Sequence, residues 1–419
     1  MKFRTQSLNF SILVFLLSMF VQADAQSRKN KATQIASPTL QVRFVSGTSA
    51  LEIPFELSSN LVLLQAKVND SAPLWFIFDT GAESTVIDTE LAKTLRLKPN
   101  GKIVGNGAAG TAQAVRFKAV SMRLPNIEIS NQTIYGLPLD SFSSPLGKKI
   151  SGVIGYDIIK EFVVEIDYAS RKINLYQPES YQYSLAGEIF PLTFEENTPF
   201  VRASIALEGR AAIDGKFEID SGSTGAILFN TPFVRKHQLL KSVSRTSETR
   251  IGGVGGTAQV FLGRVKSIAL GRFTLENAVA RFSQGTRGDY ASAKYNGLIG
   301  GEIFRRFKTI FDYSRKRMIL EPNAQFSEPY EIDMSGMELL ADGDDFSTVL
   351  VDDVKAKSPA AEARVRGGDI ITAIDNRSVK EFTLEQIRQM FRQNGREYLL
   401  NLKRNGKVVQ AKIKLRRLT

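Results

Sequence analysis

The stretch "WFIFDTGAEST", Trp75–Thr85, is an apolar strand that stops at an aspartate and turns at once through Thr-Gly. Aspartate is rarely buried unless another group pairs with it. One such motif could be an ordinary turn at a strand end. A second copy, "KFEIDSGSTGAIL" at Lys216–Leu228, places Asp220 141 positions after Asp79. Because each copy is an apolar strand that ends in Asp-hydroxyl-Gly, the pair indicates an internal repeat.

The repeat extends well beyond the two aspartates. "IPFELSSN" from Ile53 matches "FPLTFEEN" from Phe190, and "GNGAAGTAQAV" from Gly105 matches "GGVGGTAQVF" from Gly252. The tails "VIGYDIIKEFVVEIDYASRKINL" from 153 and "LIGGEIFRRFKTIFDYSRKRMIL" from 298 share seven identical residues without gaps. The sequence therefore predicts two homologous lobes, at 45–182 and 183–325.

Short alternating runs separated by Gly or Asn predict that both lobes are mainly β. Helices are expected only near 88–95, after the Ile-Gly pairs at "YDIIKEF" and "GEIFRRF", and in the segment around His237. The run Gly105–Gly110 fits G-x-G-x-x-G, but a nucleotide site needs a helix to open there. The following "TAQAVRFKAVSMRL" alternates like a strand, which favours a hairpin tip.

The composition excludes several catalytic classes. The protein has no cysteine, so it has no thiol nucleophile and no thiolate metal site. Its only histidine is His237, and no G-x-S-x-G motif occurs, so a His-rich zinc site and a nucleophile-elbow serine hydrolase are disfavoured. No metal and no other cofactor is expected. Carboxylates remain as the strongest catalytic candidates.

A pseudo-twofold axis between the lobes would bring Asp79 and Asp220 together. Two carboxyl groups about 3 Å apart share one proton, so the pair can hold and deprotonate an attacking water. The protonated partner donates to the developing oxyanion. The residues expected to support the two loops are Thr80, Gly81, Ser221 and Gly222 beside the aspartates, and Ile154, Gly155, Ile299 and Gly300 behind them.

Residues 45–325 resemble the retropepsin/pepsin-like aspartic peptidases. The resemblance rests on the two Asp-Thr/Ser-Gly triplets and on the Ile-Gly elements that follow each at similar spacing. It implies two β-barrel lobes in one polypeptide, endopeptidase activity, and an extended peptide or protein as substrate. The two glycine-rich hairpins would be flaps, with Gly107, Gly110, Thr111, Gly255, Gly256 and Thr257 as the candidate tip residues.

The sequence departs from the pepsin-like pattern at two points. Neither hairpin carries a flap tyrosine, and Ala82 stands where a serine would add a hydrogen bond to the dyad. Without that bond the ionised dyad is less stabilised, which predicts a milder pH optimum than that of pepsin.

After Glu321-Pro322 the composition changes, and 330–419 resembles a PDZ domain, a small α/β fold. The resemblance implies a groove for a peptide or a protein C-terminus between the strand near 337–340 and the helix from 384 to 391. The candidate groove residues are Gly336, Met337, Glu338 and Leu339. A small structural cap is the alternative.

The N-terminus indicates export. Lys2 and Arg4 precede an apolar run at 10–21 and Ala-Asp-Ala at 23–25, which is typical of a cleaved signal peptide over 1–25. A polar leader is expected over 26–44, and no stable membrane span is expected after cleavage. The location predicted is periplasmic or secreted.

The formal charge of +12 falls to +11 without the first 25 residues. No aromatic-interleaved basic patch accompanies it, so no nucleic-acid partner is expected.

Three functions follow as hypotheses. The leading one is an exported aspartic endopeptidase, active as a monomer, with a PDZ module for substrates or partners. The second is an inactive peptide-binding protein of the same fold, which the two intact triplets disfavour. The third is an envelope scaffold that acts through the PDZ module, in which Asp79 would be dispensable.

Overall fold

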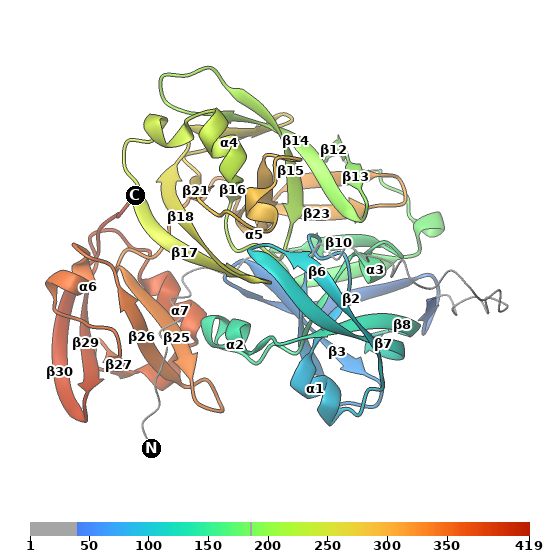
Figure 1. Cartoon of the computed structure of the whole chain (residues 1–419), viewed down its shortest axis with the longest axis horizontal. Helices are drawn as coiled ribbons and strands as arrows, with labels where there is room; N and C mark the ends of the chain where they lie inside the picture. Colours follow the sequence, from blue (N-terminus) through green and yellow to red (C-terminus); the bar gives the residue numbers. More distant parts are fainter. Residues whose placement is uncertain (1–39, 185–186) are drawn as a thin grey trace.

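The computed structural model describes residues 40–184 and 187–419 (Figure 1). The predicted signal peptide and most of the predicted leader lie outside these residues. The fold is mainly β, with 50% strand and 13% helix in three sheets, as the sequence predicts. In the described part of the protein, no helix is long and apolar enough to cross a membrane.

The first lobe contains the first Asp-Thr-Gly and one glycine-rich hairpin. Its strands are β1 (Gln41–Phe44), β2 (Ser49–Ser58), β3 (Leu61–Val68), β4 (Leu74–Phe78), β5 (Val86–Asp88), β6 (Pro99–Gly107), β7 (Gly110–Leu124), β8 (Ile127–Leu137), β9 (Gly152–Ile154), β10 (Val163–Asp167) and β11 (Lys172–Tyr176). Its helices are α1 (Thr89–Thr94), α2 (Asp140–Leu146) and α3 (Tyr156–Ile159). The last four residues of the predicted leader form β1, which pairs with β8 and so belongs to this lobe.

The second lobe repeats this arrangement. Its strands are β12 (Glu188–Pro191), β13 (Thr193–Glu195), β14 (Thr198–Ala206), β15 (Ile213–Asp220), β16 (Ile227–Phe229), β17 (Ser247–Gly253), β18 (Gly256–Arg264), β19 (Ser267–Leu270), β20 (Phe273–Glu276), β21 (Val279–Ser283), β22 (Gly297–Gly300), β23 (Phe307–Asp312) and β24 (Arg317–Pro322). Its helices are α4 (Thr231–Lys236) and α5 (Gly301–Phe304).

The two lobes join through one continuous sheet. β10 of the first lobe pairs antiparallel with β23 of the second, with Glu165 opposite Ile310 at the centre of the register. These strands are the homologous tails found in the sequence, so their pairing places the pseudo-twofold axis between them. One apolar core cluster contains residues from both lobes, including Phe76 and Phe217.

The C-terminal domain has its own apolar core. It consists of β25 (Met337–Asp342), β26 (Thr348–Val354), β27 (Ile370–Ile374), β28 (Arg377–Ser378), β29 (Glu397–Arg404), β30 (Lys407–Lys414), α6 (Pro359–Glu362) and α7 (Leu384–Met390). Among the described strands, β25 lies at the edge of this sheet and pairs with β26 alone.

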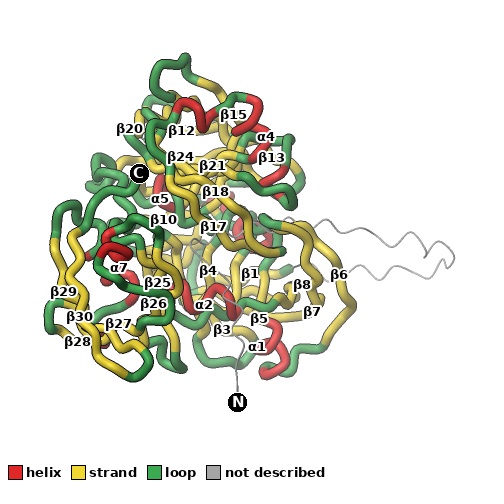
Figure 2. Tube along the Cα trace, turned by 60° about the vertical axis from the view of Figure 1, so that its left-hand side comes forward, coloured by secondary structure: helices red, strands yellow, loops and turns green. Residues whose placement is uncertain are grey.

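Helices α1, α3, α4 and α5 lie where the sequence predicts them. Helix α2 was not predicted, because its sequence contains Pro145 and several serines, which favour turns. It ends at Gly147, whose φ of 64° is the left-handed conformation that favours glycine at a helix end. Figures 1 and 2 show α2 reaching from the first lobe to β25 and α7, where it packs on the C-terminal domain.

Candidate active site

The two Asp-hydroxyl-Gly turns follow strands with the same pairing pattern. β4 runs parallel to β9, with Phe78 opposite Ile154. In the second lobe β15 runs parallel to β22, with Ile219 opposite Ile299. In each lobe a further short strand, β5 or β16, lies antiparallel on the other side of β9 or β22. The duplication in the sequence is therefore also a duplication of topology around the two aspartates.

Hydroxyl groups of Thr80 and Ser221 bind the two turns across the lobe interface. Thr80 N donates to Ser221 Oγ at 3.0 Å, and Ser221 N donates to Thr80 Oγ1 at 2.9 Å. Each hydroxyl then donates onward into the opposite strand: Thr80 Oγ1 to Ile219 O at 2.8 Å, and Ser221 Oγ to Phe78 O at 3.0 Å. All four bonds are buried, so the interface fixes both turns as one unit.

Close approach of the two turns requires glycine after each hydroxyl residue. A Cβ at Gly222 would lie 2.3 Å from Asp79 Cγ, and one at Gly81 would lie 3.0 Å from Asp220 Cγ. Each carboxyl group therefore packs directly on the backbone of the other turn. The structure brings Asp79 and Asp220 together as the sequence predicts.

Both aspartates are completely buried. Burial raises the pKa of Asp79 to about 7, against a smaller opposing effect from its hydrogen bond with Gly81 N. Burial and the neighbouring charge of Asp79 raise the pKa of Asp220 well above its usual value. Among the described residues, Asp79 Oδ2 and both oxygens of Asp220 have no hydrogen-bond partner. These three oxygens are the atoms at which a water or a substrate carbonyl can bind.

The Ile-Gly elements support the turns from behind through backbone bonds. Asp79 N donates to Ile154 O at 3.0 Å, and Gly300 N donates to Ala226 O at 3.0 Å. Gly155 has no room for a side chain, since a Cβ there would lie 2.7 Å from Ala82 O. The two Ile-Gly elements therefore lie directly behind the two turns.

The two glycine-rich hairpins, β6–β7 and β17–β18, meet at their tips. Ala109 N donates to Val254 O at 3.1 Å. A Cβ at Gly255 would lie 2.3 Å from Gly110 O, and a Cβ at Gly107 would lie 2.5 Å from Val254 O. Thr111 and Thr257 lie one residue into the return strands.

Each hairpin tip buries apolar side chains against the opposite lobe. Val254 packs in a cluster of the first lobe that includes Ile77 and Leu139. Ala108 and Ala109 pack in a cluster of the second lobe that includes Tyr290 and Leu298. Each hairpin tip therefore completes an apolar cluster of the opposite lobe.

Sequence reasoning missed Glu218, which lies two residues before Asp220 in β15 and is 2% exposed. Alternation along a strand puts Glu218 on the same face as Asp220. The matching residue before Asp79 is the apolar Ile77. Burial, then the charges of Asp289, Asp79 and Glu83, raise the pKa of Glu218. The sequence does contain a signal that could have identified Glu218. It is a charged residue inside an apolar strand, at the position where the other lobe has Ile77.

The predicted groove residues of the C-terminal domain lie together at the start of β25. Gly336 has a φ of 78° and precedes Met337, the first residue of the strand. Gly336, Met337, Glu338 and Leu339 all line a cavity between this domain and the lobes. Within the described residues, no group of three or more His, Asp or Glu side chains is arranged to hold a metal ion.

Thr80→Val should loosen both turns, because it leaves Ser221 N and Ile219 O buried without their partner. We expect a loss of about 1–3 kcal/mol in the free energy of unfolding. Denaturation followed by the fluorescence of Trp75, the single tryptophan, measures this in the first lobe. Thr94→Val on the exposed face of α1 is the matched control. Equal stability of the two variants would contradict the assigned role.

Asp79→Asn should stabilise the protein at neutral pH. The pKa of Asp79 is raised on folding from 3.8 to about 7, so the carboxyl group reduces stability progressively as pH rises through that window. The amide removes this effect, and we expect a gain on the order of 1–3 kcal/mol at pH 7.5 that disappears near pH 4. Denaturant titrations at both pH values, beside the exposed Asp70→Asn, test the difference. If the variant is less stable than wild type at pH 7.5, burial does not destabilise the ionised carboxylate of Asp79.

Comparison with known families agrees with this geometry. Residues 64–158 match the family described as aspartyl protease, a segment that contains Asp79, Ile154 and Gly155. Residues 327–415 match the PDZ domain. No curated protein matches this sequence. The protein thus contains an aspartyl protease domain, of which Asp79 is part, and a C-terminal PDZ domain.

Proposed function

We propose that this protein is an exported aspartic endopeptidase that hydrolyses peptide bonds with a water activated between Asp79 and Asp220. The observation that carries the proposal is the buried pair of carboxyl groups, held across the lobe interface by the reciprocal Thr80 and Ser221 bonds. Membership of the aspartyl protease family suggests the same activity. The second aspartate lies outside the matched segment, and its assignment rests on the repeated topology.

In the proposed reaction the dyad carries one proton. The ionised carboxylate accepts a proton from water as the water oxygen attacks the scissile carbonyl carbon. The protonated carboxyl group donates to the carbonyl oxygen, which would otherwise develop a full negative charge in a dry site. Collapse of the tetrahedral intermediate breaks the C–N bond, and the departing nitrogen takes a proton from the dyad.

Because the dyad is completely buried, we propose that the two hairpin tips, which contact each other, separate to admit substrate. An extended peptide would then lie between the hairpins and the aspartates. Separation uncovers the two apolar clusters that Val254 and Ala108 occupy in the closed form. The flap role of the six predicted tip residues is part of this proposal.

The PDZ domain implies peptide binding, and we propose that it recruits or positions peptides for the lobes. Since a single polypeptide supplies both aspartates, the enzyme is proposed to act as a monomer. The signal-peptide pattern at the N-terminus supports a periplasmic or secreted location.

The test is cleavage of a mixed peptide library, read by mass spectrometry between pH 3 and pH 9. The mature wild type should cut, and Asp79→Asn and Asp220→Asn should lose at least about a thousandfold of kcat/KM. The base must be ionised, so the rate should rise as pH increases toward the pKa of Asp79 near 7 and fall when Asp220 loses its proton. We expect an optimum in the neutral range.

Equal cutting by all three proteins would assign the activity to a contaminant or to another site. No cutting by folded wild type at any pH would favour the peptide-binding alternative. A rate that keeps increasing toward pH 3 would show that the pKa values of the two aspartates are low, as in a solvated site that works in acid.

Glu218→Gln should move the alkaline limb of the pH–rate profile toward lower pH. The charge of Glu218 raises the pKa of Asp220, so its removal lets Asp220 lose its proton sooner. The pH dependence of kcat/KM measures the shift. Glu208→Gln, an exposed carboxyl group of the same lobe, should leave the limb in place. If the alkaline limbs of the pH–rate profiles of Glu218→Gln and wild type are identical, Glu218 does not influence the pKa of the dyad.

A further inference from the structure

Tyr290 is a completely buried tyrosine of the second lobe, and its hydroxyl oxygen has no hydrogen-bond partner within 40–184 or 187–419. It lies in the short 3₁₀ turn Asp289–Ala291, between β21 and β22. A buried hydroxyl group without a partner reduces the stability of a folded protein, so its presence calls for an explanation. The position of Tyr290 relative to the dyad supplies one.

The strand register places Tyr290 on the face of the sheet that carries Asp220. Leu228 of β16 lies opposite Leu298 of β22, and Leu298 lies opposite Glu218 of β15, so the three side chains form one row on one face. Glu218 and Asp220 project from the same face, because side chains alternate along a strand. Tyr290 packs in one apolar cluster with Leu228 and Leu298. It therefore lies over the row of side chains next to Asp220.

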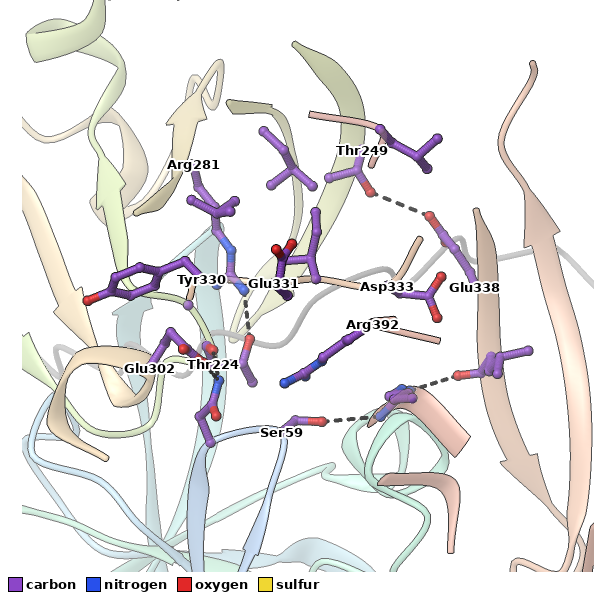
Figure 3. A pocket seen from close by; sticks show the side chains of 18 of the residues that line it. Ser59, Thr224, Thr249, Arg281, Glu302, Tyr330, Glu331, Asp333, Glu338 and Arg392 are labelled. Carbon is purple, nitrogen blue, oxygen red and sulfur yellow. Dashed lines mark hydrogen bonds between the residues drawn. The ribbon is translucent and has the colours of Figure 1, made fainter. Parts of the chain in front are cut away.

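The neighbouring charges agree with this placement. Burial, and then the negative charge of Asp220, raise the pKa of Tyr290 well above its usual value, against an opposing effect from Arg281. Arg281 lies opposite Leu228 and so extends the same row into β21. Its Nη2 donates at 2.8 Å to Thr224 Oγ1, in the loop that follows Asp220, and Figure 3 shows this bond. The hydroxyl group of Tyr290 therefore stays protonated beside the dyad and is available to donate a hydrogen bond.

The turn that carries Tyr290 also contacts the tip of the β6–β7 hairpin. Tyr290 N donates to Ala108 O at 3.2 Å. A Cβ at Gly288 would lie 2.3 Å from Gly107 O, so the turn packs directly on the backbone of the tip. Tyr290 thus joins the hairpin tip to the strand face of Asp220. The proposed function places an extended peptide between these same two parts of the molecule.

We propose that Tyr290 is a substrate-binding residue, whose hydroxyl group donates a hydrogen bond to a backbone carbonyl oxygen of the extended peptide beside Asp220. The inference rests on the proposed function, because it assigns a further role within the same site. The hydrogen bond that folding leaves unmade at Tyr290 is then formed when the peptide binds.

The first test is Tyr290→Phe, which removes the hydroxyl group and keeps the ring. We expect KM for a cleaved library peptide to rise about tenfold with kcat nearly unchanged, because the lost bond forms in the substrate complex and the transition state alike. The melting temperature should equal or exceed that of wild type, since the hydroxyl group has no partner to lose. A hydroxyl group with a structural role would instead lower the melting temperature on removal.

Tyr168→Phe is the matched control. Tyr168 is 1% exposed, and its hydroxyl oxygen likewise lacks a partner in the part of the protein that the structure describes. Burial alone raises its pKa, whereas the charge of Asp220 contributes at Tyr290. The ring of Tyr168 lies in the core of the first lobe, 5.8 Å from the ring of Phe55 between centroids. We expect this variant to leave KM unchanged.

A binding measurement separates this inference from the proposed function. Full-length mature protein with Asp79→Asn is incubated with the mixed peptide library, and the peptides retained on ultrafiltration are identified by mass spectrometry. Adding Tyr290→Phe should remove a subset of the retained peptides, and adding Tyr168→Phe should remove none. Peptides held by the PDZ domain alone should be common to all three proteins.

An unchanged KM or an identical set of retained peptides in Tyr290→Phe would overturn the proposal, and so would a lower melting temperature. If wild type cuts no peptide, the endopeptidase function fails. A subset of retained peptides that depends on Tyr290 would still support the hydroxyl group as a donor to bound peptide.

Discussion

The hydrogen bonds between Thr80 and Ser221 are the constraint on which the active site depends. They tie two turns 141 residues apart in the sequence to each other's strands, so neither aspartate can move independently of the other lobe. The pairing of β10 with β23 sets the two lobes in the symmetric position that lets these bonds form. The burial of the two carboxyl groups and their raised pKa values follow from that fixed geometry.

Placing two carboxyl groups in a dry interface is unfavourable for folding and useful for catalysis. Complete burial raises the pKa of Asp79 toward neutrality. Glu218 adds a further buried carboxyl group on the same face. Burial of Asp79 gives a second physical reason, beside the missing serine at Ala82, to expect a milder pH optimum.

The PDZ domain packs directly against the lobes through hydrogen bonds. Glu385 of α7 accepts from Ser59 N at 2.9 Å, and Arg388 donates to Ser59 Oγ at 3.2 Å. Helix α2 lies against the strand that a peptide would use. The start of β25 therefore lines a cavity shared by the PDZ domain and both lobes, and Arg281 connects this cavity to the loop that follows Asp220 through its bond to Thr224.

Repetition in the sequence was enough to predict the class of fold, the two lobes and the two aspartates, because each lobe repeats the same local strand-turn signal. The close approach of Gly222 to Asp79 could be expected, since only glycine allows it. Tertiary structure alone decided where α2, Arg281 and Gly147 lie. Their contacts join residues that are far apart in sequence and show no periodicity, so no local pattern encodes the three-domain cavity.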